Sequence, residues 1–200
     1  MANETKNILS SSVHREQFPT DQYVSACVIG FFFAGLEPNS KYSKSTDPVP
    51  SVKFLMAGYL RNDDGTPKVD AEGNKIVVRK WTNWKAISYG ERSGLTQLFK
   101  GVSNLERLLT SNDPDGDLWK TPFKIQLEEA SKEGYTNITR IKLGGSEDVL
   151  DITYDKDFVP YKIVKAYGKD VYLEEAYLKT ADGVQKYTNE QMIDPPNDNA

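Results

Sequence analysis

Apolar and polar residues alternate with a period of two along much of this chain, and that pattern predicts β-strands. Residues 20–36 are largely apolar at both parities, which predicts a long strand buried on both faces, with Gly30 marking a bulge. Residues 51–61 predict a second strand with two different faces. Its core face carries Val52, Phe54, Met56 and Leu60, and its opposite face carries Lys53, Tyr59 and Arg61.

The stretch from Lys75 to Phe99 predicts a third strand that leads into a helix. Residues 75–87 open with three β-branched side chains and carry Trp81 and Trp84 among basic residues. Ser88 and Glu91 have capping-box spacing, which predicts the start of a helix. The apolar positions that follow have helical spacing and should pack inward: Leu95, Leu98, Phe99 and Val102.

Apolar and polar residues also alternate in residues 118–128 and 135–143, and this pattern predicts a hairpin with one solvent-exposed face. The order of three strands, a helix and two strands favours a mainly β protein with a short helix. Its architecture would be an OB-fold-like, five-stranded Greek-key barrel, with extra C-terminal β elements. The expected divisions are a flexible arm (1–19), the OB-fold-like domain (20–143), a β extension (144–181) and a disordered acidic tail (182–200).

Charge is distributed unevenly, although the net charge is only −4. Residues 51–143 contain fifteen basic and twelve acidic side chains, a balance of +3, whereas residues 144–200 contain six and twelve, a balance of −6. A mildly basic centre therefore precedes an acidic end.

Several function classes find no support in the residues. One cysteine, Cys27, and one histidine, His14, are too few for the common zinc sites, and one cysteine cannot form an intramolecular disulfide. The sequence has no Walker loop and no recognisable nucleophile–histidine motif, so we expect no enzyme, no catalytic residues, no metal and no cofactor. It has no signal-peptide pattern and no apolar run of about 20 residues, so we expect a cytoplasmic protein without membrane contact.

The candidate chemistry is the binding of single-stranded nucleic acid, which needs cations for the phosphates and flat aromatic faces for the bases. The second and third predicted strands supply both kinds of residue. The nucleic-acid-binding candidates are Lys53, Tyr59, Arg61, Arg79, Trp81 and Trp84, with Lys124 and Arg140 on the closing hairpin. Trp81 and Trp84 have opposite parity, so we favour Trp81 for base stacking and Trp84 for the core or for packing against the helix. The alternatives are that both tryptophans lie in the core and that Tyr59 and Arg61 lie on an ordinary solvated face.

Residues 20–143 resemble a group of phage-encoded, OB-fold single-stranded-DNA-binding proteins. The resembling stretches are YVSACVIGFFFAGL, the tryptophan-bearing strand, ISYGERSGLTQLF, SNLERLL and the hairpin KIQLE…GYTNITRIKL. The resemblance implies binding of single-stranded DNA without strong sequence preference, during phage replication or recombination in the host-cell cytoplasm. It also implies that an acidic tail recruits replication or recombination proteins and shields the DNA groove.

Two other interpretations stay open from the sequence. A phage structural or assembly protein would share the acidic composition and the sheet-rich core without any nucleic-acid binding. A carboxylate-only nuclease would reveal itself by magnesium-dependent cleavage of labelled DNA.

Overall fold

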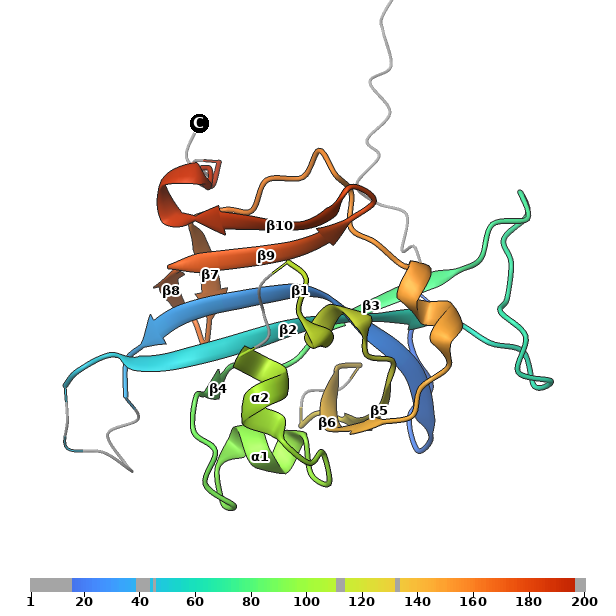
Figure 1. Cartoon of the computed structure of the whole chain (residues 1–200), viewed down its shortest axis with the longest axis horizontal. Helices are drawn as coiled ribbons and strands as arrows, with labels where there is room; N and C mark the ends of the chain where they lie inside the picture. The colour runs from blue at the N-terminus through green and yellow to red at the C-terminus, as the bar shows by residue number, and fades with distance from the viewer. Residues whose placement is uncertain (1–15, 39–43, 45, 111–113, 132–133, 197–200) are drawn as a thin grey trace, which may run out of the picture.

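The computed structural model describes residues 16–38, 44, 46–110, 114–131 and 134–196. These residues form a mainly β protein built on an open antiparallel sheet with two short helices (Figure 1). The strands of the sheet are β1 (Tyr23–Leu36), β2 (Val49–Tyr59), β3 (Val77–Trp81), β4 (Lys85–Ala86), β5 (Phe123–Glu129), β6 (Thr136–Leu143), β9 (Glu175–Thr180) and β10 (Gly183–Thr188). A separate ribbon contains β7 (Ile163–Ala166) and β8 (Lys169–Tyr172).

The helices are α1 (Gly94–Leu98) and α2 (Leu105–Thr110), and the 3-10 turns are η1 (Asp117–Lys120), η2 (Glu147–Asp151) and η3 (Asn189–Gln191). Helix α1 begins later than the sequence predicted. Ser93 is its N-cap, because the Ser93 hydroxyl accepts a hydrogen bond from the Thr96 backbone N–H at 3.1 Å. Leu95 and Leu98 are buried as predicted.

Strand β1 organises the sheet, because β2 pairs with one of its edges and two different strands share the other. Its first residues pair with β5, and Gly30–Phe33 pair with β9. The register with β2 shifts between Val28 and Gly30, so the predicted bulge at Gly30 is confirmed. A methyl group at Gly30 would lie 3.0 Å from the Leu55 Cβ, so the absence of a side chain allows β1 and β2 to approach closely here.

Apolar side chains fill three clusters around β1 and β2. The largest lies between β1, β2, β5, β6 and the helices, where the Phe54 ring lies 5.3 Å from Phe31 and 5.4 Å from Phe99. The predicted core face of β2 is confirmed, since Val52, Phe54 and Met56 belong to this cluster and the partly buried Leu60, just after β2, packs against it. A second cluster lies under β8 and β9, and a third lies between β1, β2 and η2.

The third predicted strand is interrupted, and the interruption decides where its tryptophans point. Thr82 is bonded to Phe54 of β2 partly through its side chain. The Thr82 N–H donates to the Phe54 carbonyl at 2.9 Å, but the Phe54 N–H donates to the Thr82 hydroxyl, at 3.0 Å, and not to a backbone carbonyl. The chain then turns, and Trp84 enters the cluster under β8 and β9 with 8% exposure. The prediction that Trp84 belongs to the core is confirmed.

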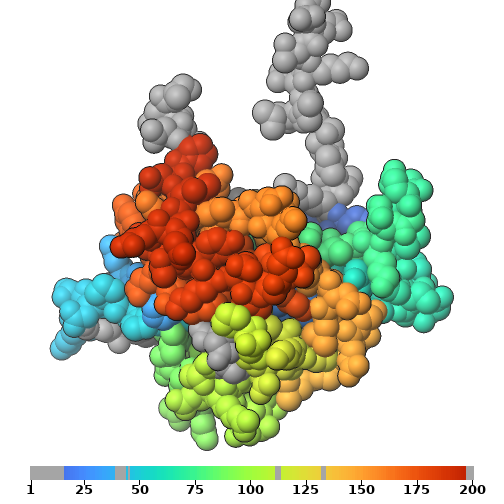
Figure 2. All heavy atoms as spheres, turned by 45° about the horizontal axis from the view of Figure 1, so that its top comes forward, coloured from blue at the N-terminus to red at the C-terminus, as the bar shows by residue number. Residues whose placement is uncertain are grey.

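The residues after Asp182 are not the disordered tail that the sequence predicted. Gly183–Thr188 form β10, which pairs with β9 at six positions, and Met192 is 3% exposed in the core. Figure 2 shows β9 and β10, in red, spread across one face of the molecule. The prediction missed this strand because Gly183–Thr188 is polar and gains its order from pairing with β9, while the last four residues lie outside the described part of the chain.

The strands form an open sheet and not the closed five-stranded barrel that the sequence predicted. Among the strands that the structure describes, β3 pairs with β2 and β6 pairs with β5, and no pairing joins β3 to β6. A groove of about 600 Å³ lies along this seam. Phe18 borders the groove and is 3% exposed, so this part of the predicted arm (1–19) packs into the core, while residues 1–15 lie outside the described chain. None of the described helices is long and apolar enough to cross a membrane.

Candidate nucleic-acid interface

The C-terminal part of the chain covers much of the face where the sequence placed the DNA. Tyr59 lies on the face of β2 opposite the main core, as predicted. It is only 8% exposed, however, and packs in the cluster that includes Val149 and Ile152. Burial, together with the carboxylates of Asp151 and Asp148, raises the pKa of Tyr59. The expectation of an exposed Tyr59 ring is therefore wrong, because the segment after β6 folds back over β2.

Arg61 is engaged within the protein. Its guanidinium donates to both Asp148 carboxylate oxygens, at 2.6 and 2.8 Å, and to the Gly65 carbonyl at 2.8 Å. This bidentate pair ties the end of β2 to η2. Arg79, by contrast, is exposed, and its contact with the Thr153 carbonyl is long, at 3.4 Å.

Trp81 and Lys53 form an aromatic and basic group at the other end of the covered face. The half-buried Trp81 ring lies 4.5 Å from the Phe32 ring, between centroids, and the planes are tilted by 40°. The Lys53 ammonium group lies 5.2 Å from the centroid of Trp81 and 5.9 Å from that of Trp84. Burial lowers the pKa of Lys53. Trp81 therefore has a packing partner on β1 and a cation already beside it.

Lys124 and Arg140, the candidates on the closing hairpin, lie on an open face. The register aligns two rows across β1, β5 and β6: Ser25, Lys124 and Lys142 form one row, and Tyr23, Gln126 and Arg140 form the other. We call these six residues the Tyr23 face. The opposite parity on β5 and β6 is buried in the main core, so the Tyr23 face is the outer side of these strands.

The Tyr23 face combines a partly exposed ring with three cations, Lys124, Arg140 and Lys142. Tyr23 is 37% exposed, and the Lys142 ammonium group lies 3.6 Å from its ring centroid. Lys124 stands directly opposite Lys142, and like charges at such positions destabilise a sheet. In the part of the chain that the structure describes, Lys124, Arg140 and Lys142 take part in no ion pair. An anion bound here would relieve the repulsion.

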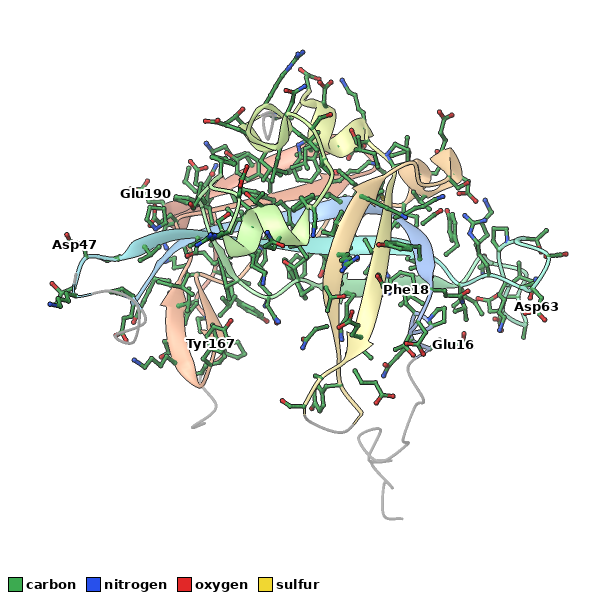
Figure 3. All side chains as sticks on the ribbon, turned by 90° about the horizontal axis from the view of Figure 1, so that it is seen from below. Glu16, Phe18, Asp47, Asp63, Tyr167 and Glu190 are labelled. Atoms are coloured by element: carbon green, nitrogen blue, oxygen red, sulfur yellow. The ribbon has the colours of Figure 1, made fainter. Side chains whose placement is uncertain are left out.

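A groove of about 610 Å³ adjoins the Tyr23 face. Among its lining residues are Tyr23, Tyr59, Arg61 and Lys68, together with Asp63. Figure 3 shows the β5–β6 hairpin from below, with Phe18 beside it and the loop of Asp63 farther out. The groove places two predicted residues, Tyr59 and Arg61, at the border of the surface that carries Lys124 and Arg140.

The sequence did not single out Tyr23 and Lys142. Lys142 could have been found from its parity, which equals that of Arg140. Tyr23 could not, because its place beside Gln126 depends on the pairing of β1 with β5.

The Arg61–Asp148 pair should contribute stability that depends on pH. Burial of the Asp148 carboxyl raises its pKa, but hydrogen bonds from Ser146 and Arg61 and the Arg61 charge outweigh burial and leave the pKa below its ordinary value. A carboxyl with a depressed folded-state pKa stabilises the fold above its unfolded pKa of about 3.9, and loses this contribution as the pH falls through the folded pKa.

Asp148→Asn should therefore be less stable than the wild type near pH 7, and the difference should shrink below about pH 4. Urea unfolding at a series of pH values measures both free energies. A difference that stays constant from pH 7 to pH 3 would contradict the role of the carboxylate charge.

Comparisons of the chain with protein-family models, with curated proteins and with solved structures find no match.

Proposed function

We propose that this protein binds single-stranded DNA, without strong sequence preference, through the Tyr23 face and the adjoining groove. The observation that carries the proposal is the partly exposed Tyr23 ring beside Lys142, with Lys124 and Arg140 on the neighbouring strands in no ion pair among the described residues. Sequence-tolerant binding of single strands uses this combination of stacking surface and cations. The proposed site differs from the one inferred from the sequence, because β5 and β6 replace β2 and β3 as its main platform.

The order of strands supports this proposal. In space the strands follow the order β3-β2-β1-β5-β6, and the helices α1 and α2 come between the third and fourth of the five strands in the chain. That connectivity is compatible with an OB-fold whose barrel is open between β3 and β6. We propose this fold assignment together with the function.

The biological role that we propose follows from the resemblance to phage single-stranded-DNA-binding proteins. The protein would coat exposed strands, as a non-enzymatic factor, during phage replication or recombination in the host cytoplasm. The short segment after Met192 retains Asp194 and Asp198 and would be the part that recruits replication or recombination proteins.

Loss of the exposed ring should weaken DNA binding and leave the fold intact. A base stacked on an aromatic side chain contributes about 1–3 kcal/mol, so Tyr23→Ala should weaken the binding of fluorescent oligo-dT by roughly 5- to 150-fold. Tyr23→Phe keeps the ring and should bind within about threefold of the wild type. Fluorescence anisotropy at fixed low salt measures the three dissociation constants.

The decisive experiment for the function compares single- and double-stranded DNA of the same sequence in a mobility-shift assay. We expect a shift with the single strand at low salt and its steep loss as salt rises. A wild-type protein that shifts neither DNA would overturn the proposal and favour a structural or assembly role.

A further inference from the structure

The β7–β8 ribbon carries a second surface, which has no part in the proposed DNA site. Figure 3 shows the ribbon, with Tyr167 at its tip, projecting beside the β5–β6 hairpin and separate from it. Ile193 is joined to the residues before β7 by a single parallel bridge. Its carbonyl accepts a hydrogen bond from the Lys162 N–H at 2.8 Å, and its N–H donates to the Pro160 carbonyl at 3.1 Å. We refer to the two-stranded ribbon together with this single bridge as the small sheet.

The two sides of this small sheet differ. Val171, Leu173 and Met192 on one side are buried against Trp84 and Phe32. The other side, which we call the Tyr172 face, consists of Tyr161, Ile163, Lys165, Asp170, Tyr172 and Ile193. The pairings Ile163–Tyr172, Lys165–Asp170 and Tyr161–Ile193 place these six side chains together.

Exposed apolar side chains are concentrated on this small sheet. Eight large hydrophobic side chains are exposed in the described part of the chain, and four of them lie here: Tyr161 (39%), Tyr167 (80%), Tyr172 (64%) and Ile193 (47%). Contiguous exposed apolar groups rimmed by charges are typical of interaction sites, and tyrosine is enriched in protein interfaces.

The turn of the ribbon supports the same interpretation. Tyr167 has a positive φ of 52°, in a two-residue turn where glycine, asparagine and aspartate are usually found. Because its side chain is 80% exposed, this conformation is not compensated by packing within the chain. An exposed tyrosine in such a turn would be explained if its ring contacted another molecule.

The charges on the Tyr172 face indicate which kind of partner it would bind. The cation and the anion on the Tyr172 face, Lys165 and Asp170, form an ion pair with each other, so the face has no surplus of positive charge to offer DNA. A face with an apolar centre and one charge of each sign is complementary to the same face on a second copy of the chain. When two copies meet about a two-fold axis, Lys165 of each copy can face Asp170 of the other.

We propose that the Tyr172 face is the contact between two copies of this chain, in a two-fold dimer that forms independently of DNA. The Tyr172 face has six residues, whereas a stable interface has about 20–30 on each side, so the association is weak and depends on concentration. Since the Tyr172 face lies apart from the β5–β6 hairpin, both copies keep their Tyr23 faces open.

A charge-reversal exchange tests the dimer directly. Sedimentation velocity of the full chain from about 1 to 200 µM should show a rising weight-average sedimentation coefficient. Lys165→Glu alone and Asp170→Lys alone should each associate at least about tenfold more weakly, because like charges then face each other. An equimolar mixture of the two variants should recover association, since each variant supplies the charge that the other lacks.

Recovery in the mixture separates a contact between copies from a loss of the ion pair within one chain, which mixing cannot repair. Tyr172→Arg should also remove association, whereas Val69→Arg, at a similarly exposed apolar position, should not. A sedimentation coefficient that stays constant over the full concentration range, or a mixture that associates no better than its parts, would overturn the proposal. Neither result depends on whether the protein binds DNA.

Discussion

Reversing the charge of Lys124 and Lys142 together should nearly abolish the binding of oligo-dT to this protein. The two lysines are paired across β5 and β6, and both belong to the Tyr23 face. Lys124→Glu/Lys142→Glu removes two phosphate contacts and adds repulsion, so we expect binding to weaken by at least about 100-fold, or about 2.8 kcal/mol, at low salt. The slope of log K against log salt concentration should also fall, by about 1.4, since each lost contact removes about 0.7 from a single-strand slope.

The matched control makes the same change in net charge at two lysines outside the Tyr23 face. Lys156 and Lys169 are exposed and lie in the segment after β6, and neither belongs to the Tyr23 face, although Lys169 forms an ion pair with Glu37. Lys156→Glu/Lys169→Glu should bind oligo-dT within about threefold of the wild type if local contacts dominate. Equal weakening by both double variants would show that only net charge matters, and would contradict the assignment of the Tyr23 face.

Removal of residues 183–200 should destabilise the protein strongly. The deletion eliminates the six paired positions of β10, the ion pair of Lys186 with Glu175 at 2.7 Å, and the buried Met192 side chain. Loss of one buried methionine side chain costs about 2–5 kcal/mol, so the free energy of unfolding should fall by at least about 3 kcal/mol. Urea denaturation followed by tryptophan fluorescence measures the change.

Two point variants separate this effect from the loss of acidic charge. Met192→Ala should reproduce a large part of the destabilisation, whereas Gln185→Ala, at an exposed position of β10, should stay within about 0.5 kcal/mol of the wild type. A deletion variant as stable as the full chain would mean that β10 does not support the sheet. The resemblance implies that an acidic tail shields the DNA groove, so its removal would tighten DNA binding, but a test of this requires that the shortened chain still folds.

Local patterns were sufficient to predict the strands that carry strong apolar alternation. Strands β2, β5 and β6 lie where alternation predicted them. Strand β1 lies where a run that is apolar at both parities predicted a buried strand, with Gly30 at its bulge. A period of two also determined which side of β2 faces the main core, because successive side chains on a strand point to opposite faces. Trp84 also lies in the core, as predicted, but the turn after Thr82 and not strand parity brings it there, since Trp81 packs against the same cluster.

The candidate site could be predicted only in part. The sequence identified Lys124 and Arg140 as basic residues on a wet face, and both lie on the Tyr23 face. It could not show that the opposite face of β2 would be covered, since that depends on the packing of Val149 and Ile152 from a segment about 90 residues later in the chain. Tyr59 was therefore assigned to solvent although it is buried.

The sequence by itself determined the mainly β character of this protein, the faces of its strongly alternating strands and the basic balance of its centre, because these depend on neighbouring residues. Only the tertiary structure decided which faces stay open, because coverage depends on contacts between residues far apart in the chain. The pairing of β1 with β5 brings Tyr23 beside Lys142, and the fold-back of η2 buries Tyr59.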